Sequence, residues 1–169
     1  MASLEELRQI SPPPSCLTRT EWDGVGFAVP ADYRAIVDTY GPGSFGDFLW
    51  VMQPVHSEDR LSITAQIPLA RRTLHELAND VVPSEVPYDI DSLIPCAFTA
   101  NGDTVYWVAV EADPADWPVV VNPAREEIWD EYDGSLLDFL VDVLGGDYSC
   151  PVFPTEFPAE TGVAFTPYG

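Results

Sequence analysis

The stretch that most constrains the fold is residues 22–52, which combines a predicted helix, a sharp turn and a strand. Pro30 suits the first turn of a helix, because the N–H group that proline lacks would have no partner there. Apolar side chains then recur at i, i+3, i+4 and i+7, the spacing of one helix face: Tyr33, Ile36, Val37 and Tyr40. Gly41 suits a left-handed helix end, and the apolar run of residues 48–52 is typical of a strand.

Capping motifs predict where further helices start. A Ser or Thr side chain and an acidic residue three positions later satisfy each other's free backbone N–H groups. Three such pairs occur in the sequence: Ser3 with Glu6, Thr73 with Glu76, and Ser135 with Asp138. The last pair opens a helix with a broad apolar face, the second opens a stripe that reaches residue 81, and residues 20–24 are expected to form a helical turn.

Short apolar runs predict a meander of antiparallel strands. They lie at residues 94–100, 104–110, 117–121 and 127–130, and the run at residues 61–67 predicts a separate, earlier strand. Asn101 and Gly102 join two of these runs, and Asn-Gly between apolar runs is a strong hairpin signal because both residues tolerate a positive φ. One set of cross-strand partners is predicted from this hairpin: Cys96, Phe98, Tyr106 and Val108.

The length of 169 residues suits one domain. We predict an α+β fold, in which a twisted, mainly antiparallel β-sheet has helices packed around it. Residues 1–17 are predicted to form an N-terminal helix and a proline-rich extension. Residues 18–169 are predicted to form the domain itself, with the proline-rich tail of residues 151–158 packed along it.

A family resemblance rests on a Trp ahead of the first long helix, a Pro-x-x-Tyr opening and a Tyr-Gly-x-Gly ending. The matching positions are Trp22, Pro30, Tyr33, Tyr40, Gly41 and Gly43. Residues 18–158 resemble the SMI1/KNR4 family of the SUKH superfamily, although Val29 stands where the family more often has Leu. The resemblance implies an α+β domain. It also implies an immunity protein that binds and neutralises a toxin, as is usual in bacteria, while eukaryotic relatives suggest a regulatory or scaffolding domain.

The charge of the chain is strongly one-sided. The sequence has 28 Asp and Glu residues against seven basic residues, all of them Arg, and its net charge is −21. This composition excludes nucleic acid as a partner, because no basic patch is present to neutralise phosphates, and it excludes anionic membranes for the same reason. Two interpretations stay open: the charge keeps the protein soluble, or it steers a basic partner onto an acidic surface.

The cysteines predict a reducing environment. Cys16, Cys96 and Cys150 are far apart in sequence, and no Cys-x-x-Cys pair occurs. This odd count, together with an acidic N-terminus that lacks a hydrophobic region, favours free thiols in the cytoplasm. The longest apolar run, residues 105–110, is too short to span a membrane.

Two loop motifs match ligand sites only in part. Residues 41–46 fit Gly-x-Gly-x-x-Gly, but dinucleotide binding needs a strand before this motif and a helix after it, and the predicted order is the reverse. Residues 130–134 look like half a calcium loop, yet Trp129 and Leu140 fall where an EF-hand requires carboxylates. We therefore predict no cofactor and no metal.

The two histidines are the best candidates for catalysis. His56 has two acidic neighbours and His75 has one, but neither has a marked nucleophile nearby in the sequence. The chain contains no lysine, which excludes Schiff-base chemistry. We predict that the protein is not an enzyme.

Together these features predict a non-enzymatic binding protein, first of all an immunity protein that occludes the active site of a basic toxin, such as a nuclease. A regulatory or scaffolding domain is the second hypothesis, and an enzyme using His56 or His75 is the third. Aromatic rings beside carboxylates suit an interface, because the ring anchors and the charges steer; packing under a loop explains Trp117 and Trp129 equally well. The candidate contact residues are Asp47, Glu58, Asp59, Trp117, Glu126, Glu127, Trp129, Asp130, Glu131 and Asp133.

Overall fold

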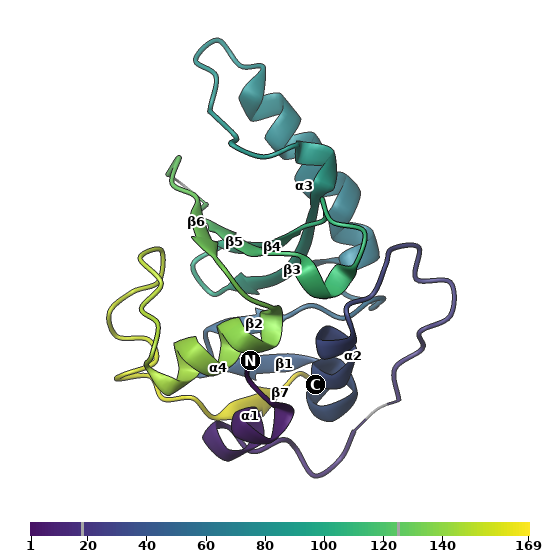
Figure 1. Ribbon diagram of the computed structural model, residues 1–169, viewed down its shortest axis with the longest axis vertical. Helices are drawn as coiled ribbons and strands as arrows, with labels where there is room; N and C mark the ends of the chain where they lie inside the picture. Colours follow the sequence, from purple (N-terminus) through teal and green to yellow (C-terminus); the bar gives the residue numbers. More distant parts are fainter. Residues whose placement is uncertain (18, 125) are drawn as a thin grey trace.

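Seven strands form one antiparallel sheet flanked by four α-helices (Figure 1) in the residues that the computed structural model describes, 1–17, 19–124 and 126–169. The strand order is β6-β5-β4-β3-β2-β1-β7. The strands are β1 Gly43–Phe45, β2 Leu49–Val51, β3 Leu93–Thr99, β4 Thr104–Val108, β5 Val119–Asn122, β6 Asp130–Tyr132 and β7 Phe165–Pro167. The helices are α1 Leu4–Ile10, α2 Ala31–Tyr40, α3 Ile63–Ala78 and α4 Leu136–Gly145. This architecture confirms the predicted α+β class with an antiparallel sheet.

The sheet is apolar on both faces. Alternate residues of a strand point to opposite sides of its sheet, and in the central strands the residues on both sides are mainly apolar. In β4, Val105 and Trp107 join a large cluster of buried residues, whereas Tyr106 joins a smaller one together with Val120 of β5. Helices α1, α2 and α4 contact one another and pack on the side of Val105 and Trp107, the covered face. Helix α3 packs over β3 on the side of Tyr106 and Val120, the open face, and stands apart from the other helices (Figure 1).

Helix α2 buries the predicted apolar face, and two of its tyrosines also make buried hydrogen bonds. The Tyr33 hydroxyl donates to the Met52 carbonyl at 2.7 Å, and the Tyr40 hydroxyl donates to the Ser11 carbonyl at 2.7 Å. These bonds tie α2 to the strand β2 region and to the end of α1. Pro30 is the residue before the helix rather than part of its first turn.

Helix α4 starts and ends where its motifs predict. Ser135 and Asp138 form the capping box, since each side chain accepts the backbone N–H of the other residue. Gly146 follows the helix with a φ of 85°, and Gly41 follows α2 with a φ of 67°. Glycine adopts these positive φ values without the steric cost that a Cβ atom brings.

Residues 63–67 form the start of helix α3, after a 3-10 turn that ends at Leu61, so the strand predicted at residues 61–67 is wrong. Ser62 is the N-cap of α3, and its hydroxyl accepts the Ala65 N–H at 3.4 Å. The apolar alternation that suggested a strand also places Ile63 and Ile67 four residues apart. That spacing puts both on one helix face, where Ile63 is fully buried.

The same helix overturns the predicted start at Thr73, which lies well inside α3. Pro68 is also inside the helix, although an interior proline removes a backbone donor and is unfavourable. The capped start and the buried face of α3 offset that cost. The helix ends at Ala78, before the predicted limit at residue 81.

Strands β3 and β4 form the predicted hairpin, with Gly102 at a φ of 88° in the connection. The register shifts at a bulge around Cys96, so that Pro95 lies opposite Tyr106. A bulge sets two residues of one strand against one of the other and thereby changes which side chains face each other. The predicted set of partners is therefore wrong: Cys96, Phe98, Tyr106 and Val108.

The other predicted strands agree only in part with the structure. The runs at 94–100, 104–110 and 117–121 correspond to β3, β4 and β5. Strand β6 lies beyond most of the run predicted at 127–130, and residues 20–24 contain a turn rather than a helix.

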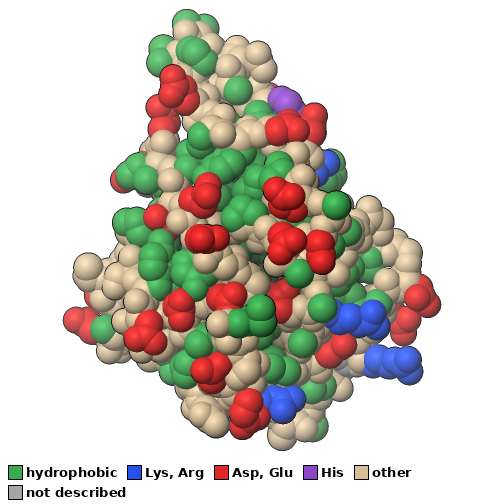
Figure 2. All heavy atoms as spheres, viewed as in Figure 1, with side chains coloured by type: hydrophobic (Ala, Val, Ile, Leu, Met, Phe, Trp, Pro, Cys, Tyr) green, Lys and Arg blue, Asp and Glu red, His purple; other side chains and the backbone are tan. Residues whose placement is uncertain are grey.

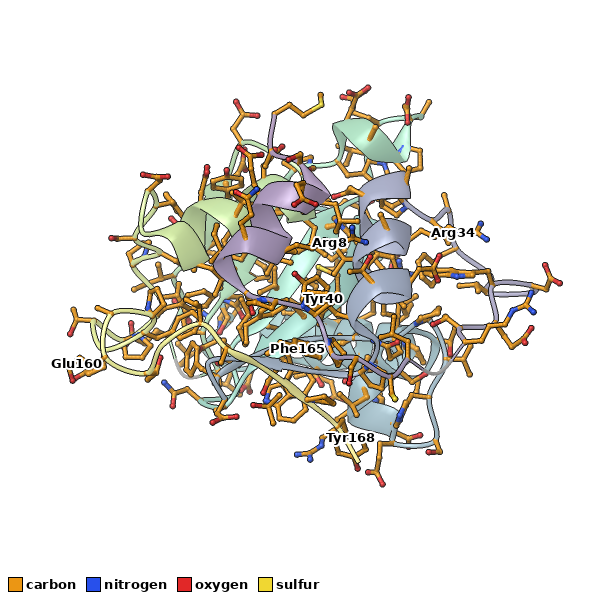
Figure 3. All side chains as sticks on the ribbon, turned by 90° about the horizontal axis from the view of Figure 1, so that it is seen from below. Arg8, Arg34, Tyr40, Glu160, Phe165 and Tyr168 are labelled. Atoms are coloured by element: carbon orange, nitrogen blue, oxygen red, sulfur yellow. The ribbon has the colours of Figure 1, made fainter. Side chains whose placement is uncertain are left out.

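No pattern in the sequence predicts strands β1 and β7, which pair with each other from distant parts of the chain. Phe45 lies opposite Phe165. A Cβ atom at Gly43 would collide with the carbonyl of Thr166, so glycine permits this close approach. Figure 3 shows Tyr40 next to Phe165, with ring centres 5.1 Å apart, so α2 and β7 share one aromatic cluster.

The proline-rich tail packs along the domain as predicted. Phe153 and Phe157 contact the ring of Phe48 at centroid distances of 5.5 and 4.6 Å. At the other end, Leu7 of α1 is fully buried in the core of the covered face. Helix α1 therefore packs with α2 and α4, while Thr18, the predicted start of the domain, lies outside the described residues.

Candidate functional site

A cleft of about 520 Å³ lies on the open face, between α3 and the outer half of the sheet. Helix α3, strands β3 to β5 and two loops contribute its walls. The lining residues are Gln66, Leu69, Ala70, Thr73, Leu74, Leu77, Ser84, Glu85, Val86, Pro95, Gly102, Thr104, Tyr106, Asn122, Pro123, Ala124, Glu126, Glu127 and Trp129. Its volume is within the range of about 300–1,000 Å³ that ligand pockets occupy.

One wall of the cleft is a single stripe of helix α3. Its members recur at i, i+3, i+4, i+7, i+8 and i+11: Gln66, Leu69, Ala70, Thr73, Leu74 and Leu77. Leu74 is buried against the sheet, whereas Leu69 and Leu77 keep 38% and 43% of their surface exposed. The upper edge of this wall therefore offers two leucines that nothing in the described chain covers fully.

The floor of the cleft consists of side chains from inner strands. Tyr106 of β4 lies opposite Pro95 of β3, and Thr104 lies opposite Asn122 of β5, so these residues share the open face. Trp129 closes the floor, with its ring centre 5.9 Å from that of Tyr106. These rings make the floor mainly apolar.

A small aromatic and acidic cluster holds the outer end of the cleft. The ring centres of Trp129 and Tyr88 are 5.5 Å apart, and the Tyr88 hydroxyl donates to the Glu131 carboxylate at 2.8 Å. Burial first, and then this bond to an anion, raise the pKa of Tyr88 well above its ordinary value. Tyr88 therefore stays a neutral donor that fixes the loop of residues 84–88 to β6.

The rim of the cleft is acidic. Among the lining residues that the structure describes, the charged ones are Glu85, Glu126 and Glu127, and all three are exposed. A second depression shares Glu85, Glu127 and Trp129, so the acidic groups belong to two loops that meet at one end of the cleft. Arg125 lies outside the described residues. Figure 2 shows exposed apolar side chains between scattered carboxylates on the face below α3.

The structure brings only some of the predicted contact residues together. Glu126, Glu127 and Trp129 line the cleft, and Glu131 lies beside it through its bond to Tyr88. The remaining predicted residues lie elsewhere. Asp47 is in the turn between β1 and β2, Glu58 and Asp59 precede α3, and Asp130, Asp133 and Trp117 lie away from the cleft lining.

The prediction of Trp117 as a surface anchor is wrong, because its side chain is only 5% exposed. Its indole N–H donates to the Glu111 carbonyl at 2.8 Å, and its ring packs 6.3 Å from that of Trp107. Asp130 is also engaged internally, since the Tyr148 hydroxyl and the Cys150 thiol both donate to it. Neither residue is free to contact a partner in this conformation.

The wall of α3 is the part of the site that the sequence does not predict. Leu69 falls just after the run predicted as a strand, and Leu77 was expected to contribute to a buried stripe. The signal that could identify them is the i, i+4, i+8 spacing of Leu69, Thr73 and Leu77. On one helix, this spacing places the two exposed leucines beside the buried Leu74. Recognising it requires that residues 63–78 be read as one helix.

The groups considered for catalysis do not converge. His56 accepts the Glu58 backbone N–H at 2.9 Å, and His75 pairs with Asp91 at 3.1 Å on the exposed side of α3. Burial raises the pKa of the Cys150 thiol to about 12 and that of Cys96 well above its ordinary value. Both thiols therefore stay protonated and poorly nucleophilic. Within the described part of the chain, no group of three or more His, Cys, Asp or Glu side chains is placed to hold a metal ion.

Comparisons with known proteins identify no match for the chain, so the site is interpreted from its own geometry. None of the described helices has the length and apolar character needed to cross a membrane. No protein-family model matches the chain, and neither a curated protein nor a solved structure matches it.

Proposed function

We propose that the chain is a non-enzymatic, cytoplasmic protein-binding domain of the SMI1/KNR4 type that acts as an immunity protein. Its partner is a basic toxin, with a nuclease as the first candidate, and binding occludes the toxin's active site. The observation that carries the proposal is the cleft on the open face, where an apolar floor lies under an acidic rim. Apolar centres with polar rims are typical of protein interfaces.

The net charge of −21 supports the choice of a basic partner. Complementary charge raises the rate of association and selects among partners more than it adds affinity. The rate of association should therefore fall steeply as salt is added, because the Debye length shortens from about 10 Å at 0.1 M to about 3 Å at 1 M. The apolar part of the interface should respond much less.

A rescue experiment tests the proposal. Any toxin-like domain that is encoded beside this gene is expressed in cells with and without the protein, and complex formation is followed by gel filtration at low and high salt. Restored growth together with a stoichiometric complex is the expected result. A toxin that stays active and never co-elutes with the protein would contradict the proposal and favour the regulatory alternative.

A matched pair of charge reversals tests the surface. The double variant Glu126→Lys and Glu127→Lys changes the rim, whereas Glu156→Lys and Glu160→Lys makes the same change in net charge on the C-terminal tail (Figure 3). The rim variant should slow association with the toxin by about tenfold or more. The tail variant should slow it far less, and equal effects would mean that only net charge matters.

A further inference from the structure

The walls of the cleft determine what backbone conformation an occupant can adopt. Strands β3, β4 and β5, which form the floor, each have a neighbour on both sides, so their backbone groups are already paired within the sheet. Helix α3 likewise pairs its own backbone internally. The cleft therefore presents mainly side chains, and an extended peptide laid in it would leave its own N–H and C=O groups without partners on the protein side. A helix satisfies these groups itself.

The dimensions of the α3 wall match a short helix. The stripe from Gln66 to Leu77 covers about 17 Å at ~1.5 Å per residue, or roughly three turns. Helices that pack side by side lie about 8–10 Å apart. On the open face α3 packs over β3, so a neighbouring helix would lie beside α3, above Thr104 and Asn122.

The exposed apolar groups define the contact face of such a helix. Leu69 and Leu77 stand two turns apart on α3, and the ring of Trp129, packed against Tyr106, lines the floor of the same cleft. A helix with apolar residues at i, i+3, i+4 and i+7 presents one continuous stripe of matching length. The described carboxylates of the rim, Glu85, Glu126 and Glu127, then face the flanks of the helix, where Lys or Arg side chains would complement them.

We propose that this cleft is the docking site for a basic amphipathic helix of about three turns, supplied by the partner protein. The apolar stripe of the helix packs between the α3 leucines and Trp129, and its cationic flanks meet the glutamates of the two loops. This inference rests on the proposed protein-binding function and names the element of the partner that the site recognises.

A helical peptide probe tests the inference directly. The probe is a fluorescein-labelled, side-chain-stapled peptide of 14 residues with Leu on one face and Lys elsewhere. Two matched peptides replace Lys by Glu, or replace the staple by a central proline that breaks the helix. Fluorescence anisotropy should show that the Lys helix binds the full chain and that each matched peptide binds at least about tenfold more weakly.

Variants of the protein locate the binding. Leu69→Asp with Leu77→Asp should weaken binding of the Lys helix by about tenfold or more, because the two changes put charges in its apolar contact. Val55→Asp with Val110→Asp is the control, since these valines are 60% and 59% exposed and do not line the cleft. Equal loss in both double variants, binding that the broken peptide reproduces, or no binding of the Lys helix at 1 mM would overturn the inference.

The outcomes separate this inference from the proposed function. A toxin that is neutralised equally well by the wild-type protein and by the Leu69→Asp, Leu77→Asp variant would retain the immunity function and overturn the cleft as its docking site. Binding of the Lys helix that depends on both leucines, with no rescue from the toxin, would retain the docking site and overturn the immunity function.

Discussion

The two faces of the sheet differ in how much of the molecule's apolar surface they bury. In the described chain, the cluster on the covered face contains 29 buried residues, contributed by the sheet, helices α1, α2 and α4, the tail and the first residue of α3, Ile63. The cluster on the open face contains six, under α3 alone. Buried apolar area is the main favourable contribution to folding, so the covered face should supply most of the stability. The open face keeps apolar groups accessible, which suits binding.

The largest expected effect is a cavity in the covered face. Phe139 is fully buried in α4 and contacts the rings of Tyr132 and Phe153. Phe139→Ala should lower the free energy of unfolding by about 3–5 kcal/mol, through lost burial and the cavity left behind. Leu74→Ala on the open face should cost about 2 kcal/mol, at the lower end of its class. Urea unfolding measures both, and equal losses would contradict the division of stability between the faces.

The next effect is a loss of stability at alkaline pH, to which buried tyrosines of both faces contribute. Burial raises the pKa of Tyr40 from 10.0 to about 12, and that of Tyr33 well above its ordinary value. Between pH 10 and pH 12, these tyrosines lose their protons in the unfolded chain but keep them in the folded chain. Stability therefore falls as the pH rises from 10 towards 12. Urea midpoints at pH 8, 10 and 11 should fall in that order.

A tyrosine variant checks the origin of this pH dependence. Tyr40→Phe removes one buried phenol, along with its bond to the Ser11 carbonyl, and should cost about 1 kcal/mol at pH 8. Between pH 8 and 11 it should then lose less stability than the wild-type protein. An unchanged difference between the two proteins across this range would exclude Tyr40 as a source of the effect.

Helix caps give a smaller effect that should also differ between the faces. Ser135→Ala removes the hydroxyl that accepts the Asp138 N–H and donates to the Asp138 carboxylate, and should cost about 1 kcal/mol. Ser62→Ala removes a single, longer cap bond of 3.4 Å from α3 and should cost about 0.5 kcal/mol. Thermal unfolding of both variants makes the comparison, with Ser135→Thr as a control that retains the hydroxyl. A larger loss from Ser62→Ala would mean that α3 is as important to stability as α4.

The smallest effect on stability should come from the cleft itself. Because Leu69 and Leu77 are already partly exposed, replacing both by Asp should change the free energy of unfolding by no more than about 0.5 kcal/mol per site. Circular dichroism during urea unfolding tests this. A large loss would show that these leucines stabilise α3 and would weaken their assignment to binding.

The covered face could be predicted well from the sequence, because its helices carry local signals. The burial of Tyr33 and Ile36 and the cap at Ser135 are each predicted from residues that lie within a few positions of one another in the sequence. Strands β1 and β7 could not be predicted, since each has only three residues and its partner is distant in the chain. The bulge at Cys96 likewise leaves no mark in the pattern of apolar residues.

The candidate site was only half predictable. Glu126, Glu127 and Trp129 could be identified because acidic and aromatic residues gather in one segment. Leu69 and Leu77 could not, because alternation before Pro68 suggested a strand and concealed the helix to which they belong. Trp117 looked equivalent to Trp129 in sequence, and only the tertiary packing separates a buried ring from an accessible one.

The pairing of β1 with β7 has a consequence for how the chain acquires its structure. Most neighbouring strands are close in sequence, but β1 must wait for the last strand of the described chain before its outer edge is paired. A nascent chain that has reached β6 therefore carries an open strand edge that includes Phe45, and unpaired edges of this kind can pair with other chains. High contact order of this sort slows folding. We expect deletion of residues 164–169 to increase concentration-dependent aggregation in light scattering, and an unchanged aggregation rate would show that this edge is protected in another way.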